Sequence, residues 1–233
     1  FTGNGGNNAI TGVGFQPDLV WSKSRNQTGH HLLYDAVRGV QKFIQSSTSN
    51  AESTNANTLT SFDSDGMTFS NGVAWCWKAN GAGSANTDGT INSTATSANT
   101  TAGFAIIKYT GNATQGATLG HGLGVKPTLI MIKSSSNAEA WVVGGNGLNA
   151  TNPYDYYLHL HTQDERGQNN NRFANVAPTT SVFSLGSEDQ VNSSSKTYIA
   201  YVFADVPGYQ KSGLYFGTGN TNGQFIDCGF KPA

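Results

Sequence analysis

The amino-acid sequence predicts an all-β fold made of tandem antiparallel β-sandwich modules, jelly-roll-like in type, with a partial third repeat. One observation behind this is an internal repeat, because similar segments begin at Phe1, Tyr109 and Tyr215. The spacing of these starts is that of a small domain and is too long for a solenoid unit. The other is the alternation of large and small apolar residues within 73–77 and 199–203, which is typical of a strand covered on both faces.

The repeat and the composition divide the chain into four parts. Between the first two copies, residues 81–102 are almost entirely Gly, Ser, Thr, Asn and Ala, with Ile91 as the one large apolar residue. Such a composition is typical of a linker or a long loop. The parts are a first sandwich module at 1–80, this linker or long loop at 81–102, a second sandwich module at 103–208 and the start of a third repeat at 209–233.

Local patterns place the elements of each module. The predicted strands are 18–23, 67–69 and 73–77 in the first module, and 128–133, 183–185 and 199–203 in the second. Pro17 and Pro127 stand just before the first strand of each set, where proline fixes the entry into a strand. Residues 70–72 read Ser-Asn-Gly, a short hairpin signal. Residues 31–44 carry apolar side chains at helical spacing and predict a helix, although strands also fit.

Low charge limits the partners that the sequence predicts. Charged residues make up 12% of the chain and the formal net charge is −1. This composition leaves no basic surface for nucleic acid or for an anionic membrane. No apolar run approaches the ~20 residues of a membrane span. We therefore expect no nucleic-acid partner and no membrane insertion.

The polar residues show no recognisable catalytic arrangement. His30, His31, Asp35 and Arg38 form one concentrated polar group. No nucleophile, second carboxylate or glycine-rich phosphate loop accompanies them at a sensible spacing. A pair of Asp35 with Arg38 that fixes a turn is the favoured interpretation. The sequence thus predicts a protein that is not an enzyme and that uses no cofactor.

Several segments together carry a family resemblance. The first module contains, in order, GFQPDLVW at 14–21, LYDAVRG at 33–39, LTSFDSDG at 59–66 and VAWCWKA at 73–79. With GHGLGVKP at 120–127 and the third copy, they resemble a repeated domain of unknown function found in long structural proteins of marine bacteriophages, such as tail fibre and virion proteins. The resemblance covers nearly the whole chain. It implies a β-module on the virion surface, and it supplies no catalytic residues.

Two pairs of residues are candidate metal ligands. Asp63 and Asp65 stand two apart before a glycine, as in the opening of a calcium loop, but the distal acidic ligands of such a loop are missing. A plain turn before a strand is the favoured reading. His159 and His161 alternate, so on a strand both rings would point to one face and could share a metal with other chains. A polar outer face, with no metal, is favoured for this pair.

A cluster of tyrosines is the candidate binding surface. Tyr154, Tyr156 and Tyr157 follow Pro153. An amphipathic tyrosine patch on a loop suits contact with a sugar or a protein. The edge of a sandwich explains the same residues, and it is slightly favoured.

These observations favour structure and binding over chemistry. We expect a module of a bacteriophage virion appendage, a tail fibre or surface fibre, that contributes to host attachment and is located on the virion or outside the cell. Expected partners are other virion proteins, further copies of the chain in a homo-oligomer, by hypothesis a trimer, and a host cell-surface receptor or glycan. Alternatives are a capsid decoration or fibre protein, a bacterial surface adhesin, a lectin-like array and, less favoured, a glycan depolymerase.

Overall fold

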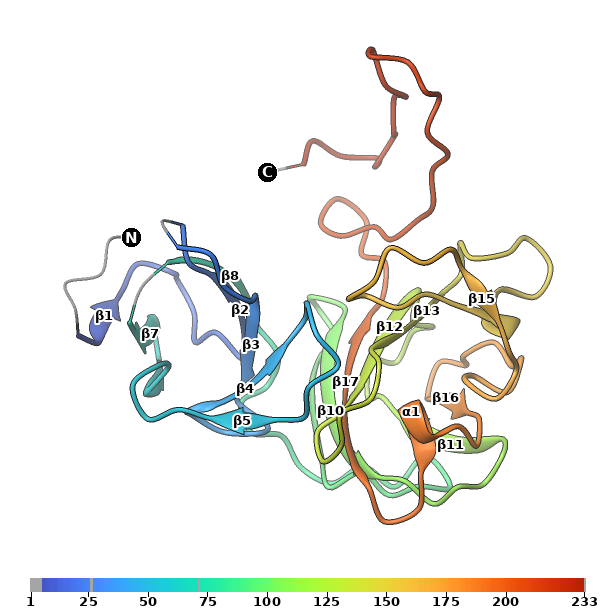
Figure 1. Cartoon of the computed structure of the whole chain (residues 1–233), viewed down its shortest axis with the longest axis horizontal. Coiled ribbons are helices and arrows are strands. Elements are labelled where there is room, and N and C mark those ends of the chain that lie inside the picture. Colours follow the sequence, from blue (N-terminus) through green and yellow to red (C-terminus); the bar gives the residue numbers. More distant parts are fainter. Residues whose placement is uncertain (1–5, 26, 71, 233) are drawn as a thin grey trace.

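The computed structural model describes residues 6–25, 27–70 and 72–232, and most of its regular structure is strand. The strand pairs of its sheets are antiparallel, and no sheet of the described residues closes into a barrel. Figure 1 shows two groups of sheets, one from the first third of the chain, in blue to teal, and one from the rest, in green to orange. The β-rich class that the sequence predicts is confirmed.

The first group contains two sheets. The larger has, in sheet order, β5 (Ser53–Thr54), β4 (Lys42–Gln45), β3 (Leu32–Asp35), β2 (Leu19–Lys23) and β8 (Val73–Trp77). The smaller has β1 (Asn8–Ile10), β7 (Gly66–Phe69) and β6 (Ser61–Asp63). Val20 and Tyr34 of the larger sheet pack with Met67 and Phe69 of the smaller in one buried cluster. The alternation of apolar side chains along β2 and β7 directs these residues inward.

The second group is built around another five-stranded sheet. Its order is β13 (Val142–Gly145), β12 (Leu129–Ser134), β17 (Thr197–Phe203), β10 (Phe104–Thr110) and β9 (Ala95–Asn99). Two short sheets pair β11 (Ala117–Gly120) with β16 (Val182–Leu185) and β14 (Tyr156–Tyr157) with β15 (Gly167–Gln168). The helices are η1 (Pro153–Asp155) and α1 (Asp189–Asn192). No helix in the described ranges is both long and apolar enough to cross a membrane.

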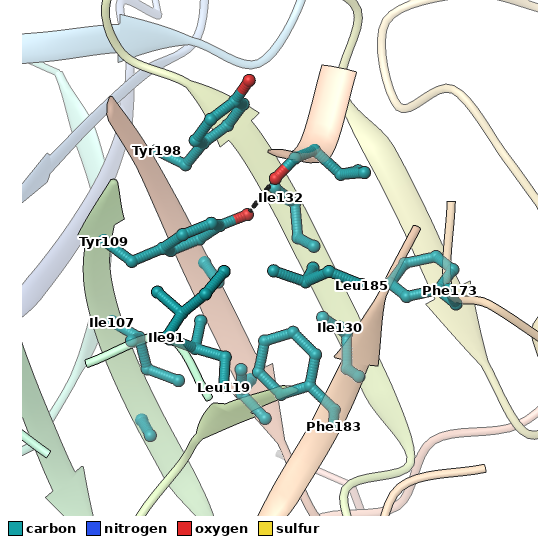
Figure 2. Packing of buried hydrophobic residues seen from close by; sticks show 14 of the residues in the cluster. Ile91, Ile107, Tyr109, Leu119, Ile130, Ile132, Phe173, Phe183, Leu185 and Tyr198 are labelled. Atoms are coloured by element: carbon teal, nitrogen blue, oxygen red, sulfur yellow. Dashed lines mark hydrogen bonds between the residues drawn. The ribbon is translucent and has the colours of Figure 1, made fainter. Parts of the chain in front are cut away.

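The largest apolar cluster lies within this second group, as Figure 2 shows. Side chains from one face of the five-stranded sheet, such as Ile107 and Ile130, meet Leu119, Phe183 and Leu185 of the β11–β16 sheet. Tyr109 stacks on Tyr198 at a centroid distance of 5.1 Å, and its hydroxyl donates a 2.6 Å hydrogen bond to the carbonyl of Val191 in α1. This bond satisfies the one polar atom that Tyr109 brings into the core.

A third cluster joins the two five-stranded sheets. Leu19, Leu33 and Ile44 of the first sheet pack with residues of the second that include Ile106 and Tyr201. Trp77 lies edge-on to Phe203, with ring centroids 6.4 Å apart. Trp141 is fully buried in the same cluster, and its Nε1 donates a 2.8 Å hydrogen bond to the carbonyl of Gln45. The two large sheets therefore bury apolar faces against each other.

A buried polar network crosses the same contact. The Arg38 Nε donates to an Asp35 carboxylate oxygen at 2.6 Å, and the Tyr201 hydroxyl donates to the same oxygen at 2.7 Å. Arg38 also donates from its backbone nitrogen to Asp35 at 2.8 Å and from Nη2 to the Leu33 carbonyl at 2.8 Å. Burial raises the pKa of Tyr201 well above its usual value. The predicted pairing of Asp35 with Arg38 at a turn is confirmed, and Tyr201 extends it to the second sheet.

Two local predictions in the first module are wrong. Residues 31–44 form no helix, because they contribute the antiparallel strands β3 and β4, with Leu33 opposite Ile44. The hairpin predicted at 70–72 is not formed either, because β7 pairs with β1 and β6 whereas β8 pairs with β2. Met67 and Phe69 of β7 pack against Val20 and Tyr34 of the larger sheet, and the next strand, β8, belongs to that larger sheet. Asn71 itself lies outside the described residues.

Strand β8 differs from the central strand that the sequence predicts at 73–77. It is the last strand of its sheet among the described residues, and Trp75 is 47% exposed. The corresponding strand β17 lies between β12 and β10, and Tyr201 is fully buried. The prediction of a covered strand is therefore confirmed for 199–203 and wrong for 73–77.

The segment 81–102, predicted as a linker or a long loop, contributes to the second group of sheets. Its last third forms β9, which pairs with β10. Ile91 is 5% exposed and belongs to the largest apolar cluster. A single large apolar residue in a polar segment thus attaches the segment to the core.

A buried histidine in the second group makes stability depend on pH. His121 is fully buried, its Nδ1 accepts a 3.1 Å hydrogen bond from the Leu123 backbone nitrogen, and its Nε2 lies 3.3 Å from the Thr179 carbonyl. Burial lowers the pKa of His121, although Thr179 and Asp88 act in the opposite direction. The neutral ring is therefore the one that the fold accommodates.

We expect the free energy of unfolding to fall as the pH drops below the ordinary histidine pKa of about 6.5. The unfolded chain takes up a proton there that the folded chain resists. Urea unfolding at pH 7.5 and at pH 5.5 measures the effect. His121→Asn removes the titrating group, so the variant should lose less stability between these pH values than the original chain. An equal loss in both proteins would show that His121 is not the source.

Candidate functional site

A pocket in the first group of sheets is the candidate binding site. It has a volume of about 370 Å³ and an aromatic lining from Tyr34, Phe43 and Phe69. The rest of its wall is mostly uncharged and polar, with Ser22, Thr28, Gln45, Asn55 and Thr58 among its residues. These residues come from β2, β3, β4, β7 and the loops between them.

The hydroxyl of Tyr34 is the most distinctive group in the pocket. It is buried and makes no hydrogen bond of good geometry within the described part of the chain. Burial raises the pKa of Tyr34 to about 12, although the neighbouring Thr58 hydroxyl and the charge of Arg38 act to lower it. A buried hydroxyl without a well-formed hydrogen bond costs free energy.

Apart from the Lys23 ammonium and the His30 ring, the polar groups of the pocket wall are hydroxyls, amides and backbone groups. Lys23 is occupied, because its Nζ donates to the carbonyls of Ser24 and Gln27 at 3.1 and 3.2 Å. His30 Nδ1 lies 3.0 Å from the Ser47 hydroxyl. Aromatic rings beside amide and hydroxyl groups are the combination that suits a small uncharged ligand with several hydroxyls. The sequence gives no sign of this pocket, because its lining comes from four separate segments, 22–34, 43–45, 55–58 and 69–70.

The tyrosine patch that the sequence suggests is not assembled as one surface. Tyr154 is 2% exposed, and its hydroxyl donates to the Asn146 side chain at 2.8 Å. Tyr156 and Tyr157 are consecutive in β14, so their side chains point to opposite faces. Arg166 covers the Tyr156 ring and Arg172 covers the Tyr157 ring, each 4.7 Å from the centroid. The three tyrosines therefore do not form one exposed patch.

The two candidate histidines do lie together. The ring centroids of His159 and His161 are 5.8 Å apart, and those of Tyr157 and His159 are 5.1 Å apart. His159 Nδ1 is 3.8 Å from the Asp164 carboxylate. Burial, His159 and Lys133 lower the pKa of His161. His159 and His161 follow β14 rather than lying on a regular strand, and no group of three or more His, Cys, Asp or Glu in the described ranges is placed to hold a metal.

The carboxylates of Asp63 and Asp65 each accept two hydrogen bonds within the protein. The two oxygens of Asp65 accept hydrogen bonds from the backbone nitrogens of Gly12 and Gly14, at 3.0 and 2.7 Å, and these bonds lower the pKa of Asp65. Asp63 accepts from the hydroxyls of Ser61 and Thr68. Both residues flank the turn between β6 and β7, which agrees with the favoured reading of a turn before a strand.

Taken together, the fold and the pocket define a mostly β protein of several antiparallel sheets with an aromatic-lined depression whose wall is mostly uncharged. The chain belongs to the family of a domain of unknown function, DUF7483, whose model matches residues 1–233. Neither a curated protein nor a solved structure matches the chain.

Proposed function

We propose that the chain is a structural and binding module of a bacteriophage virion appendage, a tail fibre or surface fibre, that contributes to host attachment. Its copies and other virion proteins are the proposed partners. The proposal is carried by the internal repeat of the sequence, together with similar strand pairings in the two groups of sheets, because repetition adds length and binding sites without requiring a catalytic centre.

The repeat extends to individual hydrogen bonds. Lys133 donates from Nζ to the carbonyls of Ser134 and Asn137, at 2.7 and 3.3 Å, as Lys23 does to the residues one and four positions after it. The strand neighbours match as well, because β2 pairs with β3 and β8 while β12 pairs with β13 and β17. Likewise β1 pairs with β7, and β11 with β16. These matches support two copies of one two-sheet module.

The pocket supports the binding part of the proposal. Its aromatic lining and uncharged polar wall suit a neutral glycan, and bacterial surfaces carry glycans that a virion contacts first. The surroundings of three aspartates, Asp35, Asp63 and Asp65, favour a binding role for the chain over a hydrolytic one. Asp35 is buried against Arg38, Asp63 accepts hydrogen bonds from the hydroxyls of Ser61 and Thr68, and Asp65 accepts them from the backbone nitrogens of Gly12 and Gly14. A depolymerase would need two carboxylates facing one groove.

Immunogold electron microscopy tests the proposal on intact particles of a bacteriophage whose genome encodes the chain. Antibodies raised against the chain should label a tail or surface fibre. Gold on the capsid shell would instead favour a capsid decoration protein, and label on uninfected bacteria would favour a bacterial adhesin. Particles that bind an antibody against their major capsid protein but carry no label for this chain would contradict a place on the virion surface.

A further inference from the structure

Two rows of side chains cross the larger sheet of the first group and form the floor of the candidate binding pocket. The inner row contains Tyr34 of β3 and Phe43 of β4, whose ring centroids are 5.9 Å apart. In the next row Ser22 of β2 lies opposite Leu32, and Leu32 lies opposite Gln45. Residues two apart in a strand share a face, so both rows point the same way. The pocket therefore lies over β2, β3 and β4, and none of its described lining residues belongs to β8.

The second group of sheets has a large apolar side chain where the first has Ser22. Ser22 directly precedes Lys23, and Ile132 directly precedes Lys133, the two lysines with matching hydrogen bonds, so Ile132 is the counterpart of Ser22. Ile132 is fully buried in the largest apolar cluster, as Figure 2 shows. Serine is much smaller than isoleucine. The first group therefore leaves space at a position where the second packs its core.

Two amide side chains on the pocket wall, those of Gln45 and Asn55, offer hydrogen-bond donors. The Gln45 Oε1 accepts from the Thr48 hydroxyl at 2.8 Å and from the Asn50 side chain at 3.2 Å. The Asn55 Oδ1 accepts from the Asn57 backbone nitrogen at 2.9 Å. Within the described part of the chain, the amide nitrogens of Gln45 and Asn55 donate no hydrogen bond. A ligand of this pocket should therefore present hydrogen-bond acceptors to them.

The charges of the lining favour an uncharged ligand. No Asp or Glu is among the described residues that line the pocket, so a positively charged amino sugar finds no counter-charge there. The Lys23 ammonium already donates to two backbone carbonyls and has one proton left. A sugar carboxylate would therefore gain only one charged hydrogen bond. A neutral sugar that carries a carbonyl acceptor matches these groups better than either charged kind.

We propose that the pocket binds one N-acetylhexosamine unit of a glycan, and that Ser22 makes room for it. The acetyl methyl group packs beside the Phe43 ring, and the acetyl carbonyl accepts a hydrogen bond from the Gln45 amide. Phe43 and Gln45 are two apart in β4 and face the same side. The volume of about 370 Å³ is near the lower end of the roughly 300–1,000 Å³ of ligand pockets, which suits one sugar unit. This inference rests on the proposed glycan-binding role of the pocket.

Saturation-transfer NMR on the full chain tests the ligand class. The probes are N-acetylglucosamine, N-acetylgalactosamine and N-acetylmannosamine, each compared with its free amino sugar and its parent hexose. At least one acetylated sugar should bind, its methyl protons should receive the most saturation, and its amine and hexose should bind about tenfold more weakly.

The outcomes separate this inference from the broader proposal. Equal binding of a hexose and its acetylated form would overturn the acetyl specificity and leave a glycan pocket. Tighter binding of the free amino sugar would overturn it as well. No binding of any of these sugars up to about 10 mM would overturn both this inference and the glycan-binding role. None of these results changes where gold-labelled antibodies bind on a virion.

Two variants test the residues. Ser22→Ile gives the first group the side chain of Ile132 and should weaken binding about tenfold or more, whereas Ser53→Ile, at an exposed position of β5 outside the pocket, should leave it unchanged. Gln45→Glu keeps the acceptor oxygen and removes the amide donor, so binding should weaken about tenfold without a change in packing. Circular dichroism checks that each variant is folded. Unchanged binding in folded Ser22→Ile, or in Gln45→Glu, would overturn the proposal.

Discussion

Replacing Asp35 with asparagine should lower the free energy of unfolding by about 3–5 kcal/mol, because it leaves the Arg38 guanidinium buried without its counter-charge. The Asp35 carboxylate is fully buried and holds Arg38 and Tyr201 at 2.6 and 2.7 Å. Asparagine keeps the shape of the side chain, so the loss reports charge rather than packing. Thermal unfolding measures it, as a fall in Tm of roughly 2–4 °C per kcal/mol for a chain of this size.

The matched control is Asp164→Asn. Asp164 is an aspartate whose side chain is 69% exposed and whose carboxylate lies 3.8 Å from Nδ1 of His159. Surface pairs of this kind contribute about 0–1 kcal/mol, so its Tm should barely change. If Asp35→Asn were no more destabilising than Asp164→Asn, the buried network would not hold the two sheets together.

Trp141→Ala should destabilise the chain by about 3–5 kcal/mol, since it removes the largest fully buried side chain of the contact between the two five-stranded sheets. The loss combines apolar area returned to water with a cavity beside Tyr201, whose ring lies 6.3 Å from that of Trp141. Chemical unfolding followed by circular dichroism measures the change.

Trp141→Phe separates packing from hydrogen bonding. It keeps an aromatic ring but loses the Nε1 donor to the Gln45 carbonyl, so we expect a smaller cost than for alanine, with about 1 kcal/mol from the lost bond. A cost below 1 kcal/mol for the alanine variant would mean that the two sheets do not depend on each other.

The sequence predicted the strands well where the pattern was local. Residues 18–23, 128–133 and 183–185 correspond closely to β2, β12 and β16, because alternating apolar side chains are enough to define a half-buried strand. The apolar spacing at 31–44 is compatible with a helix and with strands. In the structure Leu33 pairs with Ile44 across a turn, so the segment forms strands. A local pattern of apolar residues does not determine which strands become neighbours in a sheet.

The errors at β8 and at the tyrosines have that same origin. Val73–Trp77 and its counterpart have nearly the same apolar pattern, yet the second is covered by β10 and the first ends its sheet. Tyr154 and Tyr156 are two residues apart, but a turn of 3-10 helix buries the first and leaves the second beside Arg166. A tyrosine suits a core and a binding surface equally, so its position depends on the tertiary fold.

A crystal structure of residues 1–233 tests most directly the claim that one two-sheet module occurs twice and that its large sheets face each other. We expect β2, β3, β7 and β8 to superpose on β12, β13, β16 and β17, with Lys23 and Lys133 each bonded to two carbonyls and the Tyr201 hydroxyl on Asp35. Different strand neighbours in the two halves, or a Tyr201 hydroxyl remote from Asp35, would contradict it.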